Sequence, residues 1–260
     1  MRFARSSPSP QPPPDAPAVP GGAGRPPGRR LAAGLLAGAG LVVLNRHLVG
    51  SADPPADARA GDPAGPVRET LTGTAGRRLA LTFDDGPHPA HTPAVLDTLR
   101  AHGVRATFFV TGENAEWQPD LLRAVAGDGH LVGNHTWSHA RLGDLSRGRA
   151  RDELARTGDL IEHAVGTAPR LARAPYGAWT ATAVRDCRAL GMEPLGWSLD
   201  TGDWTRPGTT RIVRALLDGV RPGAIVLAHD GGGDRTQTVA ALAYCLPRLL
   251  DRGWDIVLPA

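Results

Sequence analysis

The chain has 260 residues, of which 41% are hydrophobic and 21% are charged, so it is long and apolar enough to bury a substantial core. Its 33 glycines and 24 prolines have no fixed period, which excludes a collagen-like repeat, and the prolines concentrate near the N-terminus. This composition predicts one globular domain behind a disordered N-terminal extension.

The net charge of +3 is concentrated in the N-terminal segment. Residues 1–50 contain six arginines and one aspartate, so the remainder of the chain is net negative. A nucleic-acid-binding domain would carry its excess of positive charge on the fold itself. We therefore expect no nucleic-acid partner.

The composition of the N-terminal extension predicts an export or anchoring segment. Residues 1–30 are rich in Pro, Gly and Arg and predict a disordered tail. An uncharged apolar run over 31–44 follows, shorter than the roughly 20 residues that a membrane-spanning helix needs. Segment 31–50 is therefore either a cleaved signal peptide or an uncleaved anchor, and the protein is expected in the cell wall or extracellular space, or tethered to the cytoplasmic membrane. Residues 51–75 predict a flexible linker, and 76–260 the globular domain.

Short apolar runs alternate with amphipathic segments from residue 78 onward. The predicted strands are 79–83, 106–110, 130–133, 170–174, 194–199, 224–228 and 254–258. The predicted helices are 93–101, 119–126, 149–165, 181–190, 209–218 and 238–252. Four glycines stand where a left-handed residue ends a helix, namely Gly103, Gly129, Gly191 and Gly253. This alternation predicts an α/β fold of about seven parallel strands, most simply a barrel.

Ligands of such folds bind at the carboxyl ends of the strands. The first predicted strand ends in the adjacent carboxylates Asp84 and Asp85, which by themselves are also typical of a surface turn. The third leads into His135 and His139, which on a helical turn would bring two imidazoles to one metal ion. Thr136 stands where a His-Glu-x-x-His peptidase needs its glutamate, which excludes that class of zinc site.

Three further strand ends carry ionisable residues: Arg173 after the fourth, Asp200 and Asp203 after the fifth, and His229 after the sixth. Each alone has a structural interpretation, as a capping arginine, a turn or a strand-end histidine. Together, five of the seven strand ends carry acids, bases or metal ligands, which indicates a catalytic site.

These segments resemble, in order, the five motifs of the polysaccharide deacetylase family, also called the NodB homology domain or carbohydrate esterase family 4. The motifs lie at 82–87, 135–139, 173–177, 200–204 and 227–229. The resemblance covers about residues 76–260. It implies a distorted (β/α) barrel and metal-dependent hydrolysis of an N-acetyl group on an amino-sugar polymer.

The resemblance implies that Asp85, His135 and His139 bind a divalent metal ion. One carboxylate and two imidazoles suit Zn²⁺, although Co²⁺, Ni²⁺ or Mn²⁺ would also bind such a set.

The resemblance also implies the acid–base groups. Asp84 is the expected general base, kept ionised and oriented by Arg173, and His229 is the expected general acid. Asp203 is expected to support one of these groups, and the sequence leaves open whether it pairs with His229 or with Arg173.

Three residues are expected to contact the substrate. The backbone N–H of Tyr176 would stabilise the oxyanion, and Trp204 and Leu227 would wall the pocket for the acetyl methyl group.

The leading hypothesis is an exported N-deacetylase acting on N-acetylglucosamine-containing polymer, with peptidoglycan ahead of chitin oligomers because an exported bacterial enzyme meets the wall first. The alternative is an amidase or esterase of the same fold acting on a small acyl amide or on acetylxylan. A non-catalytic wall-binding or scaffold protein would have lost Asp84, a metal ligand or His229, and none is lost. We expect a monomer, with Cys187 and Cys245 as buried thiols, or as one disulfide if the domain is exported.

Overall fold

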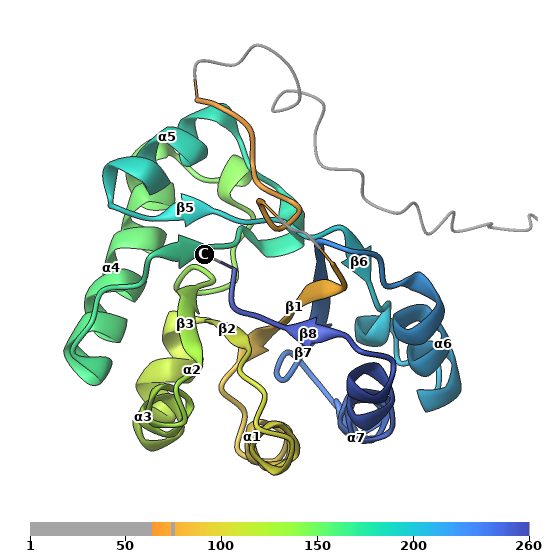
Figure 1. Ribbon diagram of the computed structural model, residues 1–260. Coiled ribbons are helices and arrows are strands. Elements are labelled where there is room, and N and C mark those ends of the chain that lie inside the picture. Colours follow the sequence, from red (N-terminus) through yellow and green to blue (C-terminus); the bar gives the residue numbers. More distant parts are fainter. Residues whose placement is uncertain (1–63, 74–75, 260) are drawn as a thin grey trace, which may run out of the picture. The chain divides into compact units, whose positions relative to one another are not determined.

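A curved parallel sheet organises the part of the chain that the computed structural model describes, residues 64–73 and 76–259 (Figure 1). The predicted tail 1–30, the apolar segment 31–50 and most of the predicted linker 51–75 lie outside the described residues. Among the helices that are described, none has the length and apolar character needed to cross a bilayer.

The described strands are β1 (Arg78–Gly86), β2 (Thr107–Val110), β3 (Leu131–Asn134), β4 (Leu171–Ala172), β5 (Glu193–Pro194), β6 (Leu199–Asp200), β7 (Ala224–His229) and β8 (Asp255–Ile256). The α-helices are α1 (Thr92–Ala101), α2 (Gly112–Trp117), α3 (Pro119–Gly127), α4 (Arg147–Val165), α5 (Ala181–Ala189), α6 (Thr209–Gly219) and α7 (Thr236–Asp251). Short 3₁₀ turns are η2 (Leu142–Asp144), η3 (Pro175–Gly177) and η4 (Asp203–Thr205).

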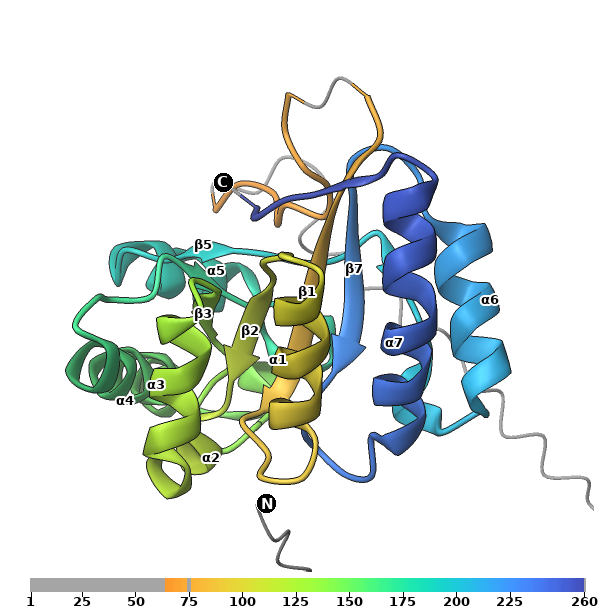
Figure 2. The same cartoon turned by 60° about the horizontal axis from the view of Figure 1, so that its bottom comes forward.

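The strands follow the order β5-β4-β3-β2-β1-β7-β6, and β8 also pairs with β1. All these pairings are parallel, which confirms the predicted α/β architecture. The long strand β1 has β7 along one edge, while β8 and then β2 share the other edge. The helices lie around the outside of the curled sheet (Figures 1 and 2).

Alternate residues of β1 face two different environments, as the two-residue period of a strand requires. Leu81 and Phe83 pack in the main hydrophobic cluster with α1, α3 and α7. Ala80 packs on the inner face of the curve, and Thr82 and Asp84 follow it there. The inner, concave face of the sheet is therefore apolar toward the amino ends of the strands and polar at their carboxyl ends, which we call the rim.

The segment 68–71, which precedes β1, runs between the two sides of the curled sheet, from β5 to β7. Arg68 pairs with Leu195, next to β5, and Thr70 pairs with Ala224 of β7. Leu71 is buried among the inner-face residues. Part of the segment predicted as a linker therefore packs against the sheet.

The single strand predicted over 194–199 is wrong, because this run forms two short strands at opposite ends of the sheet. β5 pairs with β4, whereas β6 pairs with β7. Between them the Gly196 N–H donates to the Arg68 carbonyl at 2.7 Å, so the chain leaves β5 there. An apolar run signals burial but does not specify which neighbour its backbone will pair with.

The remaining predicted strands and helices are confirmed, with bounds that differ by at most three residues. The four glycines predicted to end helices all have positive φ, between 64° and 80°. Helix α2 was not predicted, because six residues beginning with glycine are too few to show a helical period.

Both cysteines are buried and free, which confirms the expectation of two thiols. Cys187 lies in α5 and Cys245 in α7, in separate hydrophobic clusters. Burial raises the pKa of the Cys187 thiol to about 12 and that of Cys245 to about 11, so neither is a reactive thiolate at neutral pH.

Candidate active site

The ionisable residues predicted at strand ends do meet at one rim of the sheet. Asp84 of β1 is the register partner of His229 of β7. Asn134 of β3 is paired with Ala172 of β4, so His135 and Arg173, the residues that follow, are also neighbours. Because the strands are parallel, side chains distant in the sequence share one small volume.

A bulge at the end of β1 separates the two adjacent aspartates. The register with β2 shifts between Asp84 and Gly86, and Asp85 has φ 70°. Asp84 therefore stays on the inner face while Asp85 is turned toward the histidines. The bulge, and not the regular alternation of side chains along a strand, re-aims the Asp85 side chain. The Asn114 amide supports this conformation by donating to the Asp85 carbonyl at 2.8 Å.

Asp85, His135 and His139 form a cluster that can hold a metal ion. Their ligand atoms lie within 4.8 Å of one another. Both histidine Nε2 atoms approach Asp85 Oδ1, at 3.3 Å for His135 and 3.1 Å for His139. Although Oδ1 is buried, it has no hydrogen-bond partner among the described residues. An orphaned carboxylate oxygen facing two imidazole nitrogens fits a divalent cation with an open coordination position.

The surroundings of this cluster orient its ligands. His135 Nδ1 lies 2.7 Å from the Arg173 carbonyl, so a proton on Nδ1 leaves the Nε2 lone pair free for a metal. Burial by itself raises the pKa of Asp85, but the contacts with His135 and His139 outweigh it and hold that pKa well below its usual range. The His139 side chain is 30% exposed whereas His135 is 3% exposed, so the cluster is open to solvent beside His139.

The two histidines converge through a loop, and the predicted helical turn is wrong. Residues 135–139 have no helical structure, and Thr136 and His139 have φ 66° and 58°. Glu153 of α4 holds this loop, because its carboxylate accepts the backbone N–H groups of Trp137 and Ser138, each at 2.8 Å. Sequence reasoning missed Glu153, since one glutamate in a charged helix carries no recognisable signal.

Asp84 and Arg173 form a buried ion pair. Arg173 Nη1 donates to Asp84 Oδ1 at 2.8 Å and to Thr82 Oγ1 at 2.7 Å, and the Arg173 side chain is fully buried. Its Nη2 donates to the Gly196 carbonyl at 2.8 Å, and its guanidinium lies 4.2 Å from the centre of the Phe109 ring. The arginine is held in one position, so Asp84 Oδ1 is held as well.

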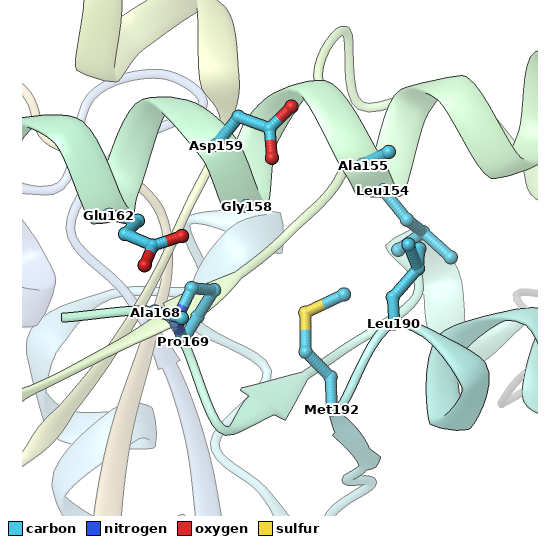
Figure 3. A pocket seen from close by; sticks show the side chains of 9 residues that line it. All are labelled: Leu154, Ala155, Gly158, Asp159, Glu162, Ala168, Pro169, Leu190 and Met192. Atoms are coloured by element: carbon cyan, nitrogen blue, oxygen red, sulfur yellow. The ribbon is translucent and has the colours of Figure 1, made fainter.

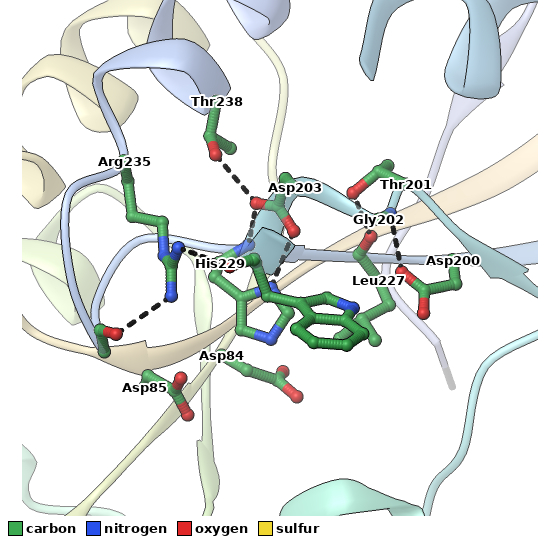
Figure 4. A network of polar contacts seen from close by, with 12 residues as sticks. Asp84, Asp85, Asp200, Thr201, Gly202, Asp203, Leu227, His229, Arg235 and Thr238 are labelled. Atoms are coloured by element: carbon green, nitrogen blue, oxygen red, sulfur yellow. Dashed lines mark hydrogen bonds and ion pairs between the residues drawn. The ribbon is translucent and has the colours of Figure 1, made fainter. Parts of the chain in front are cut away.

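Asp203 pairs with His229, which resolves the question that the sequence left open. Asp203 Oδ1 lies 2.7 Å from His229 Nδ1, while Oδ2 accepts the His229 backbone N–H at 2.9 Å. Thr238 also donates to Oδ2, at 2.8 Å (Figure 4). Burial by itself lowers the pKa of His229, but Asp203, together with the charges of Asp84 and Asp85, raises it to about 9. His229 therefore holds a proton at neutral pH.

The three expected substrate-contacting residues lie on the same rim segments. Tyr176 has φ 62°, is 51% exposed, and presents its ring to His139 at 4.8 Å between centroids. Trp204 in η4 is 49% exposed. Leu227 of β7 is buried, two residues before His229. Half-exposed aromatic rings beside a polar site are suited to stacking on sugar rings.

A hollow elsewhere in the molecule does not belong to this site. It lies along α4 and is lined by Leu154, Ala155, Gly158, Asp159, Glu162, Ala168, Pro169, Leu190 and Met192 (Figure 3). None of the rim residues lines it, and its two carboxylates have no histidine beside them among the lining residues. The chemistry of the rim therefore identifies the candidate site.

Comparison with known proteins agrees with this geometry. The family model for polysaccharide deacetylase matches residues 72–195. A chitooligosaccharide deacetylase from Bradyrhizobium sp. (strain ANU 289) is 44% identical over 192 residues, covering 69% of this chain and 88% of that protein. A peptidoglycan-N-acetylglucosamine deacetylase from Bacillus cereus is 39% identical over 181 residues, covering 69% of this chain and 84% of that protein.

The crystal structure of the Bc1960 peptidoglycan N-acetylglucosamine deacetylase is similar to this structure with a TM-score of 0.71 and 33% identity, covering 74% of this chain and 89% of that one. The chain therefore belongs to the polysaccharide deacetylase family, and it is a hydrolase of the deacetylase type.

Proposed function

We propose that this protein removes N-acetyl groups from N-acetylglucosamine-containing glycans in a metal-dependent reaction. One observation carries the proposal: a buried carboxylate with a fixed cation, Asp84 with Arg173, lies beside the metal-ligand cluster, and a protonated imidazole, His229 with Asp203, occupies the neighbouring strand end. A base and an acid close to a cation site are what metal-assisted amide hydrolysis requires.

Asp85, His135 and His139 are the proposed metal ligands, with Zn²⁺ as the expected ion and Co²⁺, Ni²⁺ or Mn²⁺ as alternatives. A bound cation would supply Lewis-acid polarisation of the amide carbonyl and acidify water in the site.

Asp84 is the proposed general base. Its Oδ2 is not engaged by Arg173 and lies 3.7 Å from His135 Nε2, so it faces the metal cluster. It accepts a proton from the water that adds to the amide carbon. Arg173 is the proposed positioning partner, since it holds Oδ1 in place.

His229 is the proposed general acid. As the carbon–nitrogen bond breaks, His229 Nε2 gives its proton to the leaving amine, and acetate and a free amino sugar are the products. Asp203 keeps the Nδ1 side of the ring occupied, so the transferable proton sits on Nε2.

Tyr176, Trp204 and Leu227 are the proposed substrate contacts. The Tyr176 backbone N–H would stabilise the oxyanion. Leu227 is buried beside the acid, and Trp204 is half-exposed, so together they would form the wall of a small acetyl pocket.

The proposed glycan is peptidoglycan ahead of chitin oligomers. Relatives named for both substrates match this chain, at 44% identity for a chitooligosaccharide deacetylase and 39% for a peptidoglycan deacetylase, so similarity does not rank them. The ranking rests on the expectation that segment 31–50 directs export, which lies outside the described residues. We further propose that the protein acts at the wall as a monomer, and that it contacts the membrane only if this segment stays attached.

The test is acetate release by the full chain from N-acetylglucosamine oligomers and from peptidoglycan, with Zn²⁺ and with a chelator. Asp84→Asn serves as the inactive control. We expect metal-dependent release that the variant loses, with the faster substrate deciding between the two glycans. Release only from acetylxylan or from a small acyl amide would replace this proposal with the alternative reading.

A further inference from the structure

Arg235 is a buried cation that lies outside the five motifs. It follows the glycine run Gly231–Gly233 and immediately precedes α7, and it is 5% exposed. None of the ion pairs formed by residues 64–73 and 76–259 includes it. Removing a guanidinium from water without a carboxylate partner is costly, so its hydrogen bonds must compensate.

The guanidinium donates to three backbone carbonyls on two different segments. Nε donates to Gly231 at 2.7 Å and Nη2 to Gly232 at 3.0 Å, both in the loop after β7. Nη1 approaches the Trp204 carbonyl of η4 at 3.5 Å, the weakest of the three. Figure 4 shows Arg235 in the same network as Asp203 and His229. A planar fork of donors can hold several carbonyls at once, which an ammonium group cannot do in the same geometry.

The glycine loop that Arg235 holds is packed directly against Asp85. A Cβ atom on Gly231 would overlap the Asp85 carbonyl, and one on Gly232 would overlap Asp85 Oδ2. Gly232 also has φ 68°, which favours glycine. The loop therefore forms one wall of the space in which the Asp85 carboxylate lies.

Backbone hydrogen bonds fix the two ends of this loop. The Asp230 and Gly231 N–H groups approach the Asp84 carbonyl at 3.1 and 3.3 Å. At the other end the Arg235 N–H donates to His91 Nε2 at 3.1 Å. The middle of the loop, Gly231–Gly232, is held by the Arg235 side chain.

We propose that Arg235 is a positioning residue that holds the glycine loop against Asp85 and ties that loop to Trp204. It thereby sets the orientation of a metal-ligating carboxylate and the place of a substrate-contacting segment together. The inference deepens the proposed function and rests on it. It predicts that loss of the fork weakens metal binding as well as turnover, because supporting groups around metal ligands are typically worth about 10-fold to 100-fold in metal affinity.

The test measures Zn²⁺ affinity of the full chain by competition with a chelating dye, for Arg235→Gln and Arg235→Lys. Arg248→Gln is the matched control, because Arg248 lies in α7, the helix that Arg235 precedes, and also donates to a backbone carbonyl, that of Tyr244. Thermal unfolding is measured for each. We expect Zn²⁺ affinity about 10-fold to 100-fold weaker in Arg235→Gln and nearly as weak in Arg235→Lys, which keeps the charge but not the fork, and unchanged in the control.

Two further measurements keep the outcome clear. Gly232→Ala disturbs the same contact from the other side and should weaken Zn²⁺ binding as well, so it decides the matter if Arg235→Gln fails to fold. On N-acetylglucosamine oligomers, Arg235→Lys should raise KM as well as lower kcat, because Trp204 is released too. Wild-type Zn²⁺ affinity and KM in folded Arg235→Lys and Gly232→Ala would overturn the inference. Failure of the wild type to bind Zn²⁺ or release acetate would instead contradict the proposed function.

Discussion

The two charge pairs near the metal-ligand cluster, Asp84 with Arg173 and Asp203 with His229, are built alike but serve different purposes. In each, an aspartate carboxylate pairs with the nitrogen of a cationic side chain at 2.7–2.8 Å. Arg173 is completely buried and permanently charged, so Asp84 keeps a constant partner. The His229 side chain is 11% exposed and titratable, so it can release its proton and take it back. The comparison teaches that a carboxylate can itself act as the base when its partner cannot titrate, and that it supports an acid when its partner can.

The largest expected effect comes from removing the base. Asp84→Asn keeps the side chain's size and a carbonyl acceptor for Arg173, but it cannot take a proton. We expect kcat/KM for acetate release to fall by about 10³-fold or more, within the usual range for a general base. Zn²⁺ binding should persist in this variant, because Asp85 and both histidines remain. A variant with more than a tenth of wild-type activity would break the assignment of Asp84.

Removing the acid should have a smaller effect. His229→Gln can still donate a hydrogen bond but cannot transfer a proton, and solvent can in part protonate the leaving amine at the open rim. We expect a loss of about 10²-fold, measured as acetate release at pH 7. If the loss were less than threefold, the proton for the leaving amine would have to come from another group.

The third prediction sharpens the comparison by changing the supporting carboxylate. In the metal-free protein the pKa of His229, raised to about 9 chiefly by Asp203 against the effect of burial, can be followed by NMR titration. Asp203→Asn should lower it by about two units, since the opposite charge is lost. Activity at pH 8 should then fall by about tenfold as the protonated fraction drops. An unchanged titration would contradict the role of Asp203.

The same pair predicts how stability depends on pH. Because the folded-state pKa of His229 is raised above its unfolded value, the pair's contribution is fully present below about pH 6.5 and is lost as pH rises through about 9. Denaturant unfolding of the metal-free protein at pH 6 and pH 9.5 should show this decrease, and Asp203→Asn should show less of it.

The smallest expected effect comes from Thr238, which donates one hydrogen bond to Asp203 Oδ2. Thr238→Val keeps the shape and removes that donor, while the His229 backbone N–H still occupies the same oxygen. We expect about 1 kcal/mol of lost stability and a change of a few-fold in activity. A loss as large as that of Asp203→Asn would mean that Thr238 orients the aspartate.

The sequence predicted the parts of this site that follow from strand order. The carboxyl ends of parallel strands must meet, so Asp84, His135, Arg173 and His229 could be placed together from their positions alone. The bulge that turns Asp85 could not be predicted, because it depends on the register between β1 and β2. The choice of His229 over Arg173 as the partner of Asp203 depends on distances across the sheet, which no spacing encodes.

Other features depend on contacts between segments that lack a local signal. The loop at 135–139 was expected to be a helical turn because two histidines four residues apart lie on one face of a helix. That prediction was wrong because the same spacing also occurs in loops. Glu153 and Arg235 act through backbone groups of distant segments, so their neighbours in the sequence do not reveal them. The run 194–199 was divided between two ends of the sheet by pairing with Arg68 and with β7.

The pH dependence of acetate release from N-acetylglucosamine oligomers tests the central claim most directly, when Zn²⁺-loaded wild type and His229→Gln are compared. Wild-type kcat/KM should fall on the alkaline side as His229 loses its proton, with an apparent pKa below the metal-free value of about 9, since a cation offsets the charge of Asp85. The variant should be slower and should lack that decrease. The same alkaline decrease in both proteins would show that a group other than His229 supplies the proton and would contradict the account.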